Sequence, residues 1–171
     1  MAQELRSLAQ PNSRFAGDDG APDPIVRAAI ARSDGDTLAY LRAVVALCSS
    51  RLLLPVVASG DETDHPDPDR HAELAAVTLN DGDQTYLVAF TGYDSLRAWR
   101  ADARPVPCLL DELSATVEPA GAHRLLIDPA GPSPFVVGED VVAMLADGHS
   151  LVEFDDGRFA WARADDPAIG V

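Results

Sequence analysis

The sequence predicts a single α+β domain: a mixed β-sheet with helices packed on it, followed by a C-terminal β-hairpin. Two kinds of segment alternate along the chain. Short apolar runs have strand length, as in Arg51 to Ala58, and other stretches carry apolar residues three and four apart. A third signal is Asp156-Gly157, which lies between two alternating runs and is typical of a tight hairpin turn. The 171 residues are enough for one domain with a substantial core.

Residues 1–22 are expected to form a flexible acidic arm, because turn-forming residues are frequent there and apolar ones are few. Phe15 is the residue of this arm that we expect to dock on the domain.

Two helices are expected next. Asp23 is an N-cap followed by proline at the first helical position, and Asp36 can cap the second helix. The apolar stripes of these helices are Val26 and Ile30 in the first, then Leu38, Leu41, Val45 and Cys48 in the second.

Three strands are predicted in the middle of the chain. Arg51 to Ala58 is apolar throughout, which favours a strand covered on both faces. Pro55 cannot donate a ladder hydrogen bond, so we expect this strand at a sheet edge or with a bulge. Glu73 to Leu79 and Thr85 to Thr91 are joined by the turn signal Asn80 to Asp83. Alternation places three side chains of the last strand on one face: Tyr86, Val88 and Phe90.

The second half of the chain alternates short helices and strands. Asp94 is expected to cap a short helix that turns Leu96 and Trp99 inward, and Pro107 to open another. The remaining expected elements are an inward helix face of Leu110, Leu113 and Val117, strands at 125–127 and 135–137, and a helix with Val141, Val142 and Leu145 that ends at Gly148.

Residues 149–171 are expected to form a hairpin extension and tail. A two-residue turn would place Phe154 opposite Phe159 and Val152 opposite Trp161, so that all four side chains share one apolar face. An isolated hairpin is marginal in water, and we therefore expect this face to dock on the domain.

Several short motifs follow one another in a characteristic order. They are Phe15 to Gly20, Pro55-Val56, Phe90-Thr91, Leu96 with Trp99, and Asp128 to Gly131. From about Phe15 to Gly148 the chain resembles the SseB N-terminal domain family, and we assign residues 23–148 to such a domain. The resemblance implies an intracellular protein without an established enzyme activity. The chain departs from the family at Gly92, where serine is common, so no hydroxyl chemistry is expected there.

The net charge of the chain disfavours some classes of binding partner. The net charge is −15 and the pI about 4.3, which disfavours binding to nucleic acids and to anionic membranes. No apolar run is long enough for a membrane span and no signal peptide is visible, so we expect a cytoplasmic protein. Two cysteines, Cys48 and Cys108, fit a reducing compartment. The sequence contains no lysine, which excludes a mechanism that uses a lysine as nucleophile or base.

The residue types of metal and catalytic sites occur without the patterns that such sites require. One acidic loop holds residue types that bind cations, but it lacks the calcium-loop pattern, and we expect it to be solvated. No Gly-x-Ser-x-Gly elbow or phosphate-binding loop occurs, and His123 with a serine or Cys108 leaves a hydrolytic enzyme as a weaker third class. We therefore predict no metal and no cofactor. The loop residues are Asp61, Glu62, Asp64, His65, Asp67, Asp69 and His71.

The preferred site comprises two turns that each follow a strand. If those strands are parallel, both turns lie at the same edge of the sheet, where loops often bind ligands or partners. The alternative is that the glycines and prolines only shape tight turns. The residues of this surface are Thr91, Gly92, Tyr93, Trp99, Asp128, Pro129 and Gly131.

The function favoured by these observations is a non-enzymatic intracellular adaptor or regulatory protein that binds another protein. We expect a monomer or a weak homodimer. The alternative is a small-molecule-binding domain with a pocket near Thr91, Tyr93 and Asp128.

Overall fold

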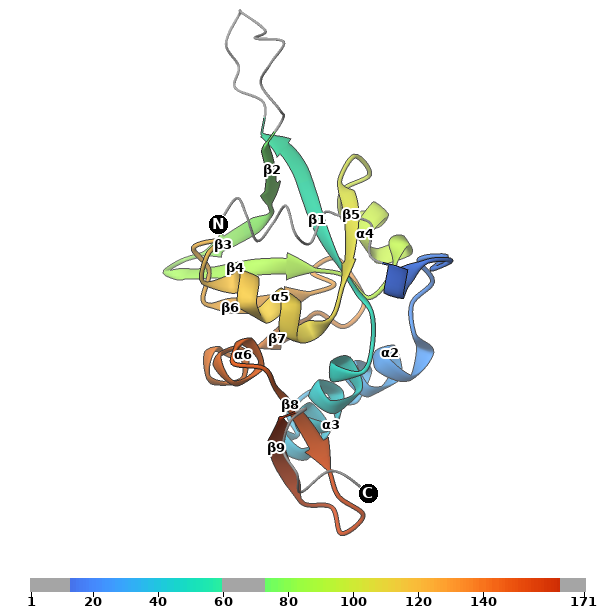
Figure 1. Cartoon of the computed structure of the whole chain (residues 1–171), viewed down its shortest axis with the longest axis vertical. Helices are drawn as coiled ribbons and strands as arrows, with labels where there is room; N and C mark the ends of the chain where they lie inside the picture. The colour runs from blue at the N-terminus through green and yellow to red at the C-terminus, as the bar shows by residue number, and fades with distance from the viewer. Residues whose placement is uncertain (1–12, 60–72, 164–171) are drawn as a thin grey trace, which may run out of the picture.

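The computed structural model describes residues 13–59 and 73–163, and within them it confirms the α+β fold (Figure 1). The helices are η1 (Ser13–Phe15), α2 (Pro24–Ala31), α3 (Thr37–Cys48), α4 (Tyr93–Trp99), α5 (Leu110–Val117) and α6 (Glu139–Ala146). The strands are β1 (Leu52–Ser59), β2 (Glu73–Ala76), β3 (Thr78–Asp81), β4 (Gln84–Ala89), β5 (Arg104–Cys108), β6 (Arg124–Ile127), β7 (Phe135–Val137), β8 (His149–Glu153) and β9 (Phe159–Arg163). Among the described helices, none is long and apolar enough to cross a membrane.

The strands form three sheets with the orders β2-β1-β5, β3-β4-β6-β7 and β8-β9. Leu53 and Phe90 exchange two backbone hydrogen bonds, of 2.8 and 2.9 Å, which tie the first sheet to the second. In the second sheet β4 and β6 are parallel, with Ala89 opposite Ile127. Helices α5 and α6 pack against each other and contact β6 on the core side of this sheet (Figure 1).

The expectation that Pro55 places its strand at an edge was wrong. β1 is the middle strand of its sheet, with Pro55 opposite Pro105 of β5. Leu53 directs its N–H and C=O toward Phe90, away from β5, and alternation places the Pro55 nitrogen on that same side. There β2 begins to pair only at Val56. Proline is tolerated because it falls in the gap between two partners on one side of the strand.

The run that was expected to form one strand, from Glu73 to Leu79, forms two. It breaks at Val77, so that β2 pairs with β1 and β3 pairs with β4. The segment therefore passes from one sheet to the other. A single apolar run carries no signal for such a change of partner, because the side-chain pattern on both sides of the break is the same.

Helix α3 buries a different face from the one expected. Ala43, Val44 and Leu47 are fully buried, whereas Leu38 is 51% exposed. The stripe we expected lies at the margin of the buried face. α3 contacts both α2 and β8, and a helix with two neighbours buries the residues that lie between them.

Two helix starts also differ from expectation. α4 begins after Gly92, which makes no side-chain cap, and Asp94 lies within the first turn. Pro107 belongs to β5, opposite Leu53, and α5 begins three residues later. Proline fits the extended backbone of this edge strand as well as it fits a helix start. The expected inward positions of α4 are confirmed, since Leu96 is 1% exposed and Trp99 is half-buried with its ring centroid 5.4 Å from that of Phe90.

The hairpin forms with a register that differs by one residue from the one expected. The Phe154 N–H donates to the Arg158 carbonyl at 2.8 Å, and the Gly157 N–H donates to the Phe154 carbonyl at 2.8 Å. The loop is therefore three residues long. Gly157, with φ +79°, takes the left-handed position that follows a type I turn in such loops. A shift of one residue exchanges the two faces of a strand.

The expected docking of the hairpin on the domain is confirmed, and on the second strand the expected residues Phe159 and Trp161 pack against the core, whereas on the first strand Leu151 does so. Leu151 is 4% exposed and belongs to the main core, while Trp161, its partner across the hairpin, packs against that core. Phe154, expected on the docked face, is 50% exposed. Arg42 of α3 forms an ion pair of 2.8 Å with Glu153. The hairpin lies beside α3 at the end of the molecule opposite β1 and β2 (Figure 1).

We predict that Leu151→Ala lowers the free energy of unfolding by about 2–5 kcal/mol, because it opens a cavity where the hairpin meets the core. Phe154→Ala is the control on the same hairpin and should change it by less than about 0.5 kcal/mol, since that ring is exposed. Denaturant melts measure both values. Equal losses in the two variants would contradict the register described above.

Candidate functional site

The two turns expected at one sheet edge do lie together, because β4 and β6 are parallel. The Asp128 N–H donates to the Ala89 carbonyl at 3.0 Å, which extends the pairing of the two strands to their carboxyl ends. Asp128 follows the end of β6 directly, and Thr91 lies two residues beyond the end of β4. The prediction that the turns share one edge of the sheet is therefore confirmed.

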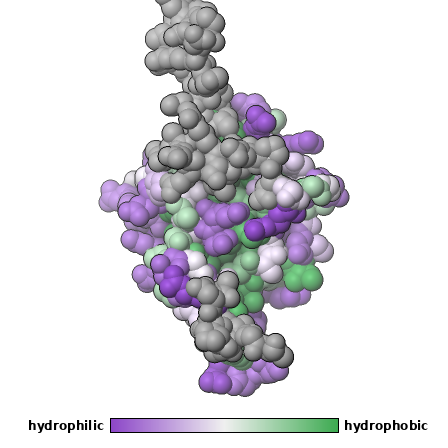
Figure 2. Space-filling view, in the orientation of Figure 1, coloured by the Kyte–Doolittle hydropathy of each residue, from purple (hydrophilic) through white to green (hydrophobic). Residues whose placement is uncertain are grey.

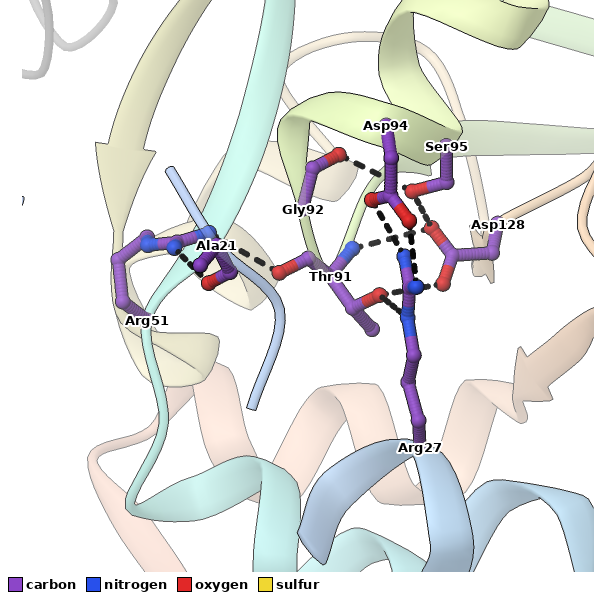
Figure 3. Close-up of polar contacts among 8 residues, drawn as sticks. All are labelled: Ala21, Arg27, Arg51, Thr91, Gly92, Asp94, Ser95 and Asp128. Atoms are coloured by element: carbon purple, nitrogen blue, oxygen red, sulfur yellow. Dashed lines mark hydrogen bonds and ion pairs between the residues drawn. The ribbon is translucent and has the colours of Figure 1, made fainter. Parts of the chain in front are cut away.

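Asp128 is the centre of a polar network at this edge (Figure 3). Its carboxylate accepts hydrogen bonds from the Thr91 N–H at 3.0 Å, from the Thr91 hydroxyl at 2.6 Å and from the Ser95 hydroxyl at 2.6 Å. All three residues are buried, with Asp128 only 6% exposed. Asp128 also has a positive φ of 51°, a conformation that aspartate tolerates better than most residues. A buried carboxylate with three donors is a well-satisfied group.

The turn after β6 presents this carboxylate. The Gly131 N–H donates to the Asp128 carbonyl at 2.9 Å, which closes a turn over Pro129 and Ala130. A side chain at position 131 would place its Cβ 3.1 Å from the Asp128 Cβ, so glycine leaves room for the aspartate. The glycine and proline of this turn thus shape the backbone around Asp128.

Arg27 of α2 connects this network to the N-terminal helices. Its Nε donates to the Thr91 hydroxyl oxygen at 2.9 Å, so that Thr91 relays between the guanidinium and Asp128. Its two Nη atoms donate to the Asp94 carboxylate at 2.6 and 2.7 Å in a bidentate pair. The hydrogen bond from Arg27 lowers the pKa of Asp94, and the same bond raises the pKa of Arg27. Asp94 is largely exposed, so the pair itself adds little stability.

A second arginine fastens part of the expected arm. We call residues 18–22 the strap. Arg51 donates to the Ala21 carbonyl at 2.6 Å and to the Thr91 carbonyl at 3.0 Å, and its Nε lies 2.9 Å from the Asp18 carboxylate. The Arg51 side chain is only 12% exposed. Arg51 therefore holds the strap against the turn at Thr91. The same turn binds Asp128 on its other side (Figure 3).

The strap approaches the start of α4 at contact distance. The Tyr93 N–H donates to the Gly20 carbonyl at 2.9 Å, and a Cβ at Gly20 would lie 1.6 Å from a ring carbon of Tyr93. A Cβ at Gly92 would lie 2.9 Å from Pro22. Glycines at positions 20 and 92 thus let two backbone segments meet, and the strap covers the edge where a ligand was expected.

The structure divides the expected surface into two groups. Thr91, Gly92 and Asp128 are buried, and their polar atoms bond to protein groups. Tyr93, Trp99, Pro129 and Gly131 are half-buried.

Sequence reasoning missed Arg27, Arg51 and Ser95, which complete the network. Their bonds span at least 30 positions of the chain. No local pattern indicates such contacts.

Neither cysteine is held as a thiolate. Burial raises the pKa of the Cys108 thiol to about 12, and burial also raises the pKa of Cys48, so both remain protonated at neutral pH. Within residues 13–59 and 73–163 no group of three or more His, Cys, Asp or Glu side chains could hold a metal ion. The acidic loop from Asp61 to His71 lies outside the described residues, and our expectation for it stays a prediction.

We predict that Gly20→Ala releases the strap from Tyr93, while Gly17→Ala does not. Both glycines have positive φ, of 76° and 88°, so backbone strain of similar size accompanies both changes. Only at Gly20 would the new methyl group collide with another side chain. Hydrogen exchange of the Tyr93 amide should be faster in Gly20→Ala by about tenfold or more, the equivalent of ~1.4 kcal/mol. Equal exchange rates in the two variants would show that the strap is not held at this contact.

Comparison with known proteins gives the family of the chain. No curated protein and no solved structure matches it. A family model, the SseB protein N-terminal domain, matches residues 26–144, which is more than half of the chain. The matched region runs from α2 to α6 and includes Arg27, Arg51, Thr91, Ser95 and Asp128. The chain therefore belongs to the SseB N-terminal domain family, as its motifs suggested.

Proposed function

We propose that this protein is a non-enzymatic intracellular adaptor that acts by binding another protein, and that its partner presents a basic surface. The observation that carries this proposal is the distribution of charge. The chain has 28 acidic residues against 13 basic ones, and many of the basic ones are neutralised within the molecule. The arginine–carboxylate pairs include Arg27–Asp94, Arg42–Glu153, Arg51–Asp18, Arg100–Asp102, Arg158–Asp156 and Arg163–Asp147.

Because arginines are used in such pairs, the surplus of carboxylates faces solvent. Hydrophilic residues, with hydrophobic ones among them, surround the grey atoms in Figure 2. Helices α5 and α6 pack against each other and carry the exposed acids Asp111, Glu139 and Asp140, and the exposed Glu118 directly follows α5. Three of them lie in first helical turns, where they also favour the helix. A surface of this sign accelerates encounters with a positively charged partner.

The alternative, a small-molecule pocket near Thr91, Tyr93 and Asp128, has less support. A ligand there would have to displace the strap and compete with the bonds of Thr91 and Ser95 to Asp128. Those bonds involve a buried carboxylate, and breaking them costs more than a typical exposed contact contributes. A hydrolytic role has little support as well, because the thiols of Cys48 and Cys108 are held in their protonated form.

The proposal predicts that a protein partner binds the full-length chain with strong salt dependence. Proteins captured from native cells at low ionic strength should be released as salt rises, and should be basic. A variant with Asp111→Asn, Glu118→Gln, Glu139→Gln and Asp140→Asn should bind the captured partner at least about tenfold more weakly in titration calorimetry.

The control variant removes the same charge elsewhere, with Asn replacing four exposed aspartates: Asp34, Asp81, Asp83 and Asp155. It should retain binding to within about threefold if the α5–α6 surface is the contact. Equal weakening in both variants would indicate long-range attraction without a defined acidic surface. Capture that recovers only metabolites, or a protein whose binding ignores salt, would contradict the proposal.

A further inference from the structure

The sheet β3-β4-β6-β7 has two unlike faces. On the inner face, Leu125 and Ile127 of β6 are fully buried beneath α5 and α6. On the other face, Leu126 is half-buried and Val136, its partner on β7, is 37% exposed. A sheet with both faces covered would bury these apolar residues as well. One end of the second face is covered, since Val88 and Phe90 pack beneath Leu96 and Trp99.

The rest of this face consists of half-buried side chains and the exposed Val136, and we call it the outer patch; Leu79 at its margin packs against the covered end. Residues directly opposite on neighbouring strands share a face, and alternate residues of one strand return to it. Arg124 lies opposite Tyr86, Tyr86 opposite Leu79, and Leu126 opposite Val136. The outer patch therefore consists of Leu79, Tyr86, Arg124, Leu126 and Val136.

Arg124 is the unusual member of the outer patch. Its Nε is shielded from solvent and has no hydrogen-bond partner. Within the described part of the chain Arg124 forms no ion pair, whereas Arg27, Arg42 and Arg51 each bind a carboxylate. The two Nη atoms of Arg124 are not shielded in this way and have no acceptor among the described residues, so a partner's carboxylate could bind both of them. Arginine and tyrosine are also among the residues enriched at the hot spots of protein interfaces.

We propose that the outer patch docks an apolar segment of a protein partner, and that one carboxylate of this segment binds Arg124. The inference rests on the proposed protein-binding function and names a surface for it, separate from the acidic residues of α5 and α6. The apolar side chains of the segment cover Leu126 and Val136, and its carboxylate binds the Nη atoms of Arg124.

Charge selects this occupant over a second copy of the chain. Two molecules of net charge −15 repel each other, which disfavours a second copy as the occupant. A basic partner that carries one acidic residue within an apolar segment satisfies both the overall attraction and the local need of Arg124.

The test uses a display library of random linear peptides, selected on the full-length protein. We expect enriched peptides with apolar residues around one Asp or Glu, and amide chemical-shift changes in β4, β6 and β7 on binding. Arg124→Gln should weaken binding of the selected peptides by about tenfold or more. Arg104→Gln, which removes an exposed arginine from β5 in the other sheet, should change it less than about twofold.

A second variant covers the case in which Arg124→Gln folds poorly. Val136→Glu places a carboxylate on an exposed position diagonal to Arg124, where it competes with the peptide, and it should weaken binding as strongly. The variant that neutralises the acids of α5 and α6 should still bind the peptides, so failure of the proposed function and failure of this surface can be told apart.

Three outcomes overturn the proposal. The first is enrichment of peptides that bind Arg124→Gln as well as the native protein, and the second is chemical-shift changes away from these strands. The third is an outer patch already filled by the protein itself. Sedimentation velocity would reveal a patch filled by a second copy as a dimer that Val136→Glu dissociates. A patch filled from within the same chain would be revealed by a monomer whose β6 amides become accessible when residues 1–12 are removed.

Discussion

The carboxylate of Asp128 is the constraint on which the arrangement of this fold depends. A buried charge must be bonded, and all its donors come from one short stretch, Thr91 and Ser95, across the end of the parallel strands. This fixes where β4, β6 and α4 meet. Thr91 then extends the network to Arg27 and so to α2, and its carbonyl extends it to Arg51 and the strap. Segments far apart in the sequence are thereby tied to one point.

This constraint bears on function as well as on fold. The carboxyl edge of parallel strands is a common place for ligands, yet here its polar groups are bonded to one another and covered by the strap. The surfaces that we propose for recognition, among the described residues, lie elsewhere. They are the exposed acids of α5 and α6 and the outer patch around Arg124. Membership of the SseB N-terminal domain family is compatible with either surface.

Local signals in the sequence predicted much of the fold, while contacts between distant segments escaped them. Asp23 and Asp36 cap their helices as expected, and the parallel pairing of β4 with β6 placed Thr91 and Asp128 together. The position of Pro55 in a middle strand could not be predicted, because it depends on where two other strands begin. The hairpin register depended on one extra loop residue. The partners of Asp128 include Ser95 on a neighbouring helix, which no spacing rule identifies.

The most direct test of this account is the free energy of unfolding of Asp128→Asn in denaturant. Asparagine keeps the size and the left-handed backbone but loses the charge that binds Thr91 and Ser95. The account predicts a loss of about 1.5–3 kcal/mol. Asp94→Asn, the exposed aspartate of the same network, should cost less than about 1 kcal/mol. A loss at Asp128 under about 0.5 kcal/mol would contradict the view that this carboxylate holds the fold together.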